Sequence, residues 1–179
     1  MPQLSQVERK FILHWGEMGT RWGVNRTVAQ VHALLYLAPR PLNAEEIAQT
    51  LSVARSNVST SLRELESWRI VKAVHLLGDR REHYESMKDV WEMFRVIIEE
   101  RKRREIDPTL GILRECLSEL PKSHPDEELT RQRLIEMQNF FETMTAFYED
   151  VRQLPAGALR SVIKMRGKIR KILSGGSRG

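Results

Sequence analysis

The segment from Pro41 to Tyr84 constrains the fold of this chain most, because two short helical patterns and a hairpin pattern follow one another there without slack. The first pattern begins at Asn43, a good N-cap residue, and Glu46 stands three positions on, where a capping-box acid belongs. Apolar residues then recur at helical spacing as far as Leu51, which predicts a helix with one buried face.

A second helical pattern follows a break at Ser52 and Val53, and its buried face carries Val58, Leu62 and Leu65. The opposite face carries short hydrogen-bonding side chains and arginines, with almost no acid in the first turn. Such side chains reach base edges and phosphates when a helix lies in a DNA major groove. We therefore predict major-groove readout by Arg55, Ser56, Asn57 and Thr60, and phosphate contacts by Ser59 and Arg63.

A hairpin pattern comes next, in which the aliphatic run from Ile70 to Leu77 is expected to pair with residues 82–85 across a turn at Gly78 and Asp79. Arg80 and Arg81 would lie at its tip, where a narrow minor groove or its flanking phosphates would attract them. We expect Asp79 to orient an arginine rather than to oppose DNA. A polar helix face or a hairpin on its own is usually solvent-exposed surface without a binding role. The three patterns together, in this order, favour DNA binding.

These residues resemble the winged helix-turn-helix of MarR-type transcriptional regulators, and most of all their GbsR-like branch. The motifs are Leu42-Asn-Ala-Glu-Glu-Ile-Ala, Ser56-Asn-Val-Ser, Leu65-Glu-Ser-Trp-Arg-Ile-Val, and Gly78-Asp-Arg-Arg with Tyr84. The resemblance implies a homodimeric repressor of transcription that binds a palindromic operator in double-stranded DNA. Ala54 departs from the family, which often has a Ser or Thr N-cap there, and this shifts the expected phosphate contact to Arg55 and Ser56.

The predicted fold is mainly α: a winged helix-turn-helix with a small β-hairpin wing, and a C-terminal α-helical dimerisation region. We assign residues 1–104 to the DNA-binding domain and residues 105–179 to dimerisation. The first helix is expected from Leu4 to about Trp15, broken by the glycines at 16, 19 and 23, and the second from about Val28 to before Pro39. Asp107 and Pro108 predict the start of a further short helix.

A heptad pattern follows Pro125, and Phe140 and Phe147 widen it. Its positions are Leu134, Met137, Phe141, Met144, Tyr148 and Val151. Packing against earlier helices or a second subunit is favoured over a cofactor site. The chain ends in a basic amphipathic pattern from Leu159 to Leu173, which we interpret as a dimer-interface helix rather than one that binds a membrane or nucleic acid.

Composition narrows the function classes. The net charge of +5 suits a polyanionic partner. The single cysteine, Cys116, excludes an internal disulfide, and we expect it in the core rather than as a redox sensor. Without a membrane-length apolar run or a signal-peptide pattern, we expect a cytoplasmic protein with no membrane partner. No catalytic motif is present, so we predict no enzyme activity, cofactor or metal. A metal site between His75 and His83 is a weaker alternative.

A small-molecule effector is a further expectation. The resemblance implies a ligand cleft beside the DNA-binding lobe, and GbsR-like relatives include a sensor of choline. The aromatic candidates are Trp15, Trp22, Trp91 and Phe94, although ordinary core packing is the preferred interpretation of them. The competing function is a winged-helix protein-interaction module without specific DNA binding. The acidic residues of the second helical pattern and the hairpin favour it, because they keep the net charge of this segment near neutral.

Overall fold

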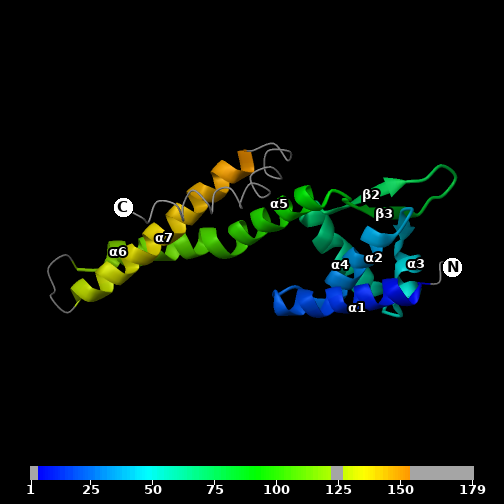
Figure 1. Cartoon of the computed structure of the whole chain (residues 1–179), viewed down its shortest axis with the longest axis horizontal. Coiled ribbons are helices and arrows are strands. Elements are labelled where there is room, and N and C mark those ends of the chain that lie inside the picture. The colour runs from blue at the N-terminus through cyan, green and yellow to red at the C-terminus, as the bar shows by residue number, and fades with distance from the viewer. Residues whose placement is uncertain (1–3, 122–126, 154–179) are drawn as a thin grey trace, which may run out of the picture. The chain divides into compact units, whose positions relative to one another are not determined.

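The computed structural model describes residues 4–121 and 127–153 and divides the chain into two compact units, Met1–Ile97 and Ile98–Gly179. The described residues are mainly helical with one small antiparallel sheet, which confirms the predicted fold class (Figure 1). The use of the second unit for dimerisation stays a prediction.

The first unit holds a winged helix-turn-helix. Its elements are α1 (Gln6–Arg21), α2 (Arg26–Leu37), β1 (Leu42–Asn43), α3 (Ala44–Leu51), α4 (Arg55–Ser67), β2 (Val71–His75), β3 (Glu82–Ser86) and the start of α5 (Val90–Arg101). Side chains of α1, α2, α3, α4 and α5 and of the first two strands form its core. The largest that are fully buried come from α2, α3, α4 and the residue before β2: Val31, Leu35, Ile47, Val58, Leu62, Leu65 and Ile70. Each contributes roughly 1.5–3 kcal/mol by leaving water, so this core fixes how α4 is presented.

The first helix is longer than the sequence predicted. The expectation that Gly16 and Gly19 would break it was wrong, because α1 continues through both to Arg21. A Cβ added at Gly19 would lie 2.5 Å from the Cβ of Ala29, and one at Gly16 would lie 2.7 Å from Cγ of Gln30. The two glycines therefore let α1 approach α2 closely, and the helix ends before Gly23, whose φ is +75°.

The sheet contains one strand more than the sequence predicted. The hairpin of β2 and β3 is as expected, with Val71 opposite Ser86 and His75 opposite Glu82. A short strand before α3, β1, pairs with the other side of β3, so the strand order is β1-β3-β2. Two residues are too few for an alternating pattern, which explains why β1 was not predicted. It joins the wing to the start of α3.

The second unit begins at Ile98 in α5 and contains a π-helical turn (Lys102–Ile106), α6 (Asp107–Glu119) and α7 (Glu128–Gln153). The predicted start of a further short helix at Asp107 is confirmed, because α6 begins there, with Pro108 in its first turn. The sequence did not predict the π-helical turn that links α5 to α6. Pro108 lacks an N–H and its ring crowds the carbonyl four residues earlier, and a π-turn before it accommodates both effects. Asp107 pairs with Lys102, 2.9 Å away.

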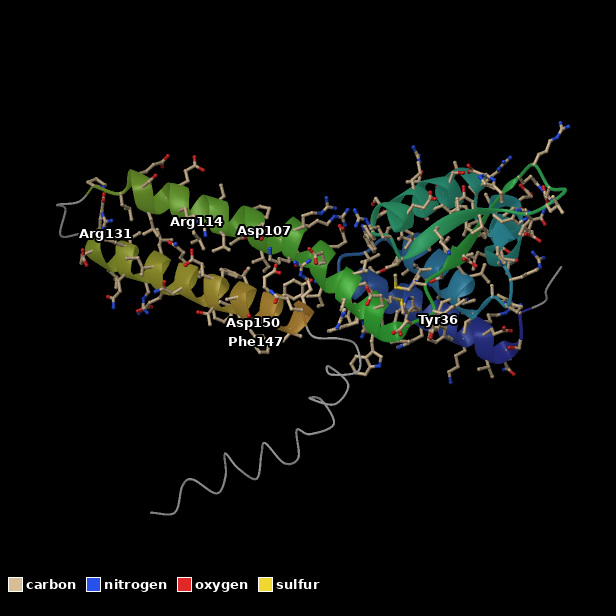
Figure 2. All side chains as sticks on the ribbon, turned by 90° about the horizontal axis from the view of Figure 1, so that it is seen from above. Tyr36, Asp107, Arg114, Arg131, Phe147 and Asp150 are labelled. Carbon is tan, nitrogen blue, oxygen red and sulfur yellow. The ribbon has the colours of Figure 1, made fainter. Side chains whose placement is uncertain are left out.

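The heptad pattern on α7 divides into two sets of residues. Leu134, Phe141, Tyr148 and Val151 are half-buried, and α7 packs beside α6, where Arg114 Nη2 lies 2.9 Å from Glu142 Oε1 (Figure 2). A second set is exposed by about half or more of its surface and forms what we call the α7 stripe: Met137, Phe140, Met144 and Phe147. The basic pattern from Leu159 to Leu173 lies outside the described residues.

Candidate nucleic-acid interface

The start of α3 is fixed by the capping box that the sequence predicted. Asn43 Oδ1 accepts a hydrogen bond from Glu46 N at 3.0 Å, and Glu46 Oε2 accepts one from Asn43 N at 2.9 Å. Arg40 Nη2 lies 2.6 Å from Glu46 Oε1, and this hydrogen bond, partly offset by burial, lowers the pKa of the Glu46 carboxyl. The acid nearest the turn therefore has its charge balanced by a neighbouring arginine.

The turn between α3 and α4 is tight. Ser52 takes the left-handed conformation, with φ of 54°, and Val53 N donates to Ala48 O at 3.0 Å. Ala54 is the N-cap of α4 and, as its side chain requires, offers no capping oxygen. No side chain caps the N–H groups of the first turn of α4, which has no acidic residue. A helix end of this kind attracts phosphate through its backbone.

The outer face of α4 carries every residue of this helix that the sequence selected for DNA contact. Val58, Ser61, Leu62 and Leu65 are buried against the core, whereas Arg55, Ser56, Asn57, Ser59, Thr60 and Arg63 are all exposed. Within this exposed set, Arg63 Nη2 donates a long hydrogen bond to Thr60 Oγ1, at 3.4 Å. Helical spacing thus brings the six side chains to one solvent-facing surface, as expected. Their contacts with bases or phosphates stay a prediction.

The two wing arginines have different surroundings. Arg81 donates from Nε and Nη2 to the Asp79 carboxylate, at 2.9 and 2.6 Å, so Asp79 orients an arginine as predicted. The hydrogen bonds from Arg81 hold the pKa of Asp79 far below its ordinary value. Arg80 is exposed and makes no hydrogen bond or ion pair with any described residue. Arg80 is therefore the cation of the tip that is free to meet phosphate.

A buried histidine supports the wing, and the sequence reasoning missed this role. His83 is only 3% exposed; its Nδ1 lies 3.0 Å from Arg81 O and its Nε2 lies 3.6 Å from Asp79 Oδ2. His83 pairs with Val74, one residue before His75, so His75 points to the opposite face of the sheet. The two rings cannot share a metal ion, and no cluster of three potential ligands occurs among the described residues.

The four aromatic residues proposed for an effector differ in their surroundings. Trp15 is half-buried and stacks on Phe11, with ring centroids 5.5 Å apart, in a row that continues through His32. Trp22 and Phe94 are each more than half exposed, and Trp91 is half-buried. Trp15 therefore has the surroundings of a core residue, in agreement with the preferred interpretation. The exposure of Trp22 and Phe94 shows that core packing was wrong for those two.

Comparisons with known proteins agree with this geometry. Residues 22–82 match the MarR family. The HTH-type transcriptional repressor GbsR of Bacillus subtilis is 20% identical over 136 residues, which cover 74% of this chain and 75% of GbsR. The putative HTH-type transcriptional regulator YvaV of Bacillus subtilis is 25% identical over 91 residues, 51% of each chain.

A crystal structure of a transcriptional regulator has the same fold, with a TM-score of 0.64 and 21% identity. The match covers 82% of this chain and 95% of that regulator. None of the described helices has the length and apolarity needed to cross a bilayer.

Proposed function

We propose that this chain is a transcriptional regulator of the MarR type and that it represses transcription as a homodimer that binds a specific site in duplex DNA. The match of residues 22–82 to the MarR family and the likeness to the repressor GbsR support a regulator rather than an enzyme. The observation that carries the proposal is the α4 surface, where six polar or cationic side chains lie exposed on a helix with an uncapped, acid-free first turn.

The α4 surface suits base readout, and the wing suits attachment. Arg55, Ser56, Asn57 and Thr60 can each donate a hydrogen bond to a base edge, and an arginine can grip guanine with two. Ser59, Arg63 and Arg80 supply donors for phosphate, with Arg81 beside them at the tip. Since phosphate contacts fix position and base contacts carry sequence information, the two groups divide the work of specific binding.

The homodimer is proposed from the α7 stripe. Its members follow one another at intervals of three, four and three residues, which is the spacing of a two-helix seam, and they lie beside the half-buried face that packs within the chain. Phe147 projects from α7 on the side away from α6 (Figure 2). A second copy of the chain would cover this stripe. Two copies related by a two-fold axis require a palindromic operator.

We place this regulator in the cytoplasm, as a DNA-binding protein without a membrane partner.

Control by a small molecule is the finer part of the proposal. The exposed rings of Trp22 and Phe94 offer faces to a cationic or aromatic ligand, whereas Trp15 is already packed. A screen of choline-like and aromatic compounds by Trp fluorescence and thermal stability tests this. If both signals stay flat across the screen, the regulator binds DNA without an effector of these classes.

Gel shifts against fragments of the source genome at two salt concentrations test DNA binding itself. We expect a few fragments to be retarded at both concentrations and the remainder only at low salt, because nonspecific binding is almost entirely electrostatic. Equal retardation of all fragments, or of none, would favour the winged-helix protein-interaction module instead.

A further inference from the structure

The tip of the wing exposes a large apolar side chain. Leu77 is 108% exposed, more than in an extended reference peptide, and Leu76 beside it is 39% exposed. Both lie in the loop between β2 and β3. A leucine with this exposure contributes nothing to the core of the unit.

The loop holds Leu77 in a defined position. Asp79 N donates to Leu76 O at 3.1 Å, which closes a four-residue turn, and Gly78 has a φ of +83°. A positive φ at the third residue is the mark of a type II turn, in which the second residue, here Leu77, stands at the corner. That corner accepts almost any residue, so the turn does not require leucine. The turn thus presents the side chain outward.

The charges around Leu77 indicate its partner. Arg80 is exposed three residues on and has no partner among the described residues, and Arg81 is held at the tip by Asp79. An apolar point beside a free cationic side chain matches the minor groove, where the sugar walls and the faces of parted bases are apolar and the rims are phosphate. A purely apolar protein surface would leave Arg80 buried without a counter-charge.

We propose that Leu77 enters the minor groove beside the recognition site as an apolar wedge that unstacks a base step, while Arg80 binds the adjacent phosphates. The inference rests on the proposed DNA-binding function. Leucine wedges kink DNA by parting stacked bases, and pyrimidine–purine steps part most easily. The wing would then select for a deformable step at a fixed distance from the bases that α4 reads, without any hydrogen bond to that step.

The test begins with duplexes selected by the wild-type protein from a random pool. We expect two signals in the selected sequences: a core read by α4, and an enriched TA or CA step at a fixed offset from it. A pool that yields no consensus at all would contradict the proposed function. A core consensus without the flanking step would overturn the wedge alone.

The direct readout uses 2-aminopurine placed at the flanking step of a selected duplex, because its fluorescence rises when it is unstacked. Wild-type protein and Leu77→Met should raise the fluorescence, and Leu77→Ser should not. Leu77→Ser should also bind the selected duplex about tenfold more weakly than wild type, yet equal it on a duplex whose flank is a stiff A-tract.

Arg80→Ala is the matched control, since it should weaken binding to both duplexes and leave the wild-type fluorescence rise at saturating protein. Because Leu77 is fully exposed, its replacement should not disturb folding, which thermal unfolding of each variant checks. A fluorescence rise that survives Leu77→Ser, or that wild-type protein does not produce, would overturn the proposal. Loss of binding to another protein rather than to DNA would assign the leucine to a protein interface and overturn it equally.

Discussion

Arg80 and Arg81 are neighbours in sequence but differ in what holds them. Arg81 is engaged by Asp79, whereas Arg80 has no described partner. We predict that Arg80→Ala weakens binding to cognate and random duplex alike and reduces the slope of log affinity against log salt by about 0.9 for each phosphate that the variant no longer neutralises. Arg81→Ala should reduce that slope less. An unchanged slope for Arg80→Ala in a salt series would make the wing a structural hairpin.

Replacing Asn57 or Thr60 should change DNA binding in a different way from replacing Arg80. Their side chains end in directional hydrogen-bonding groups on the exposed face of α4. Asn57→Ala or Thr60→Ala should cost roughly 1–3 kcal/mol of binding free energy on the cognate duplex and little on random DNA. Fluorescence anisotropy titrations on both duplexes measure the difference. Ser67→Ala, at the far end of the same helix, is the control. Equal losses on both duplexes would place these side chains on phosphate.

His32 predicts how stability depends on pH. Its ring is 4% exposed and its Nε2 has no hydrogen-bond partner in the described structure; burial, with Lys88 nearby, lowers its pKa from 6.5 to about 4. The unfolded chain therefore binds a proton at a higher pH than the folded chain. The neutral His32 ring therefore contributes to the free energy of unfolding fully above about pH 6.5. This contribution is lost as the pH falls towards 4, by roughly 3 kcal/mol at most.

Urea unfolding at several pH values checks this contribution. His32→Phe keeps an aromatic ring and removes the titration, so its free energy of unfolding should fall less between pH 7 and about pH 4.5 than that of the wild type. Acids with lowered pKa, such as Asp79 and Glu46, act equally in both proteins and cancel in the comparison. Parallel pH profiles would show that His32 does not titrate as its burial requires.

At the scale of single residues, the sequence predicted exposure well and burial of polar groups poorly. The exposed face of α4 followed from helical periodicity, and the Asp79–Arg81 pair followed from their closeness in the chain. The burial of His83 beneath the wing could not be predicted, because it depends on the pairing of β3 with β1, which is distant in the sequence. Contacts between residues distant in sequence leave no mark in a single chain.

At the scale of elements, close approach between α1 and α2 depends on glycine. Gly19→Ala should push its new Cβ into Ala29, 2.5 Å away, and destabilise the unit by roughly 1–3 kcal/mol. Gly111→Ala in α6 is the matched control, since nothing lies within 4 Å of its added Cβ. That change should stabilise the helix by about 0.5–1 kcal/mol. Thermal unfolding separates the two; similar effects would mean that α1 can move away at no cost.

The same glycines show why some elements were misjudged from sequence. Glycine lowers helix propensity, so Gly16 and Gly19 suggested a break, yet tertiary packing overrode propensity and used their small size. Asp107 and Pro108 correctly predicted the start of α6, but the π-turn that joins it to α5 leaves no sequence pattern of its own. The capping box at Asn43 and the hairpin were correct because both signals are local.

At the scale of the whole molecule, the α7 stripe predicts assembly. Phe140→Glu with Met144→Glu should yield monomers, because two charges would face the partner's apolar seam. Asn139→Glu is the control, because Asn139 is exposed and lies next to Phe140 but is not part of the α7 stripe. The protein with this substitution should remain dimeric. Light scattering of each variant measures the mass. The half-buried Phe141 and Tyr148, which the sequence had placed in the same seam, pack within the chain, and changing them would confuse folding with assembly.

Sequence-specific recognition through α4 is the central claim, and one titration tests it directly. Wild-type protein and an Arg55→Ala, Asn57→Ala double variant are titrated against a selected duplex and its scrambled counterpart at one physiological salt concentration. Wild type should bind the selected duplex about 10³-fold or more tightly than the scrambled one, and the variant should lose most of that ratio while its scrambled-duplex affinity changes far less. A ratio near one for the wild type, or one that the variant keeps, would contradict the account.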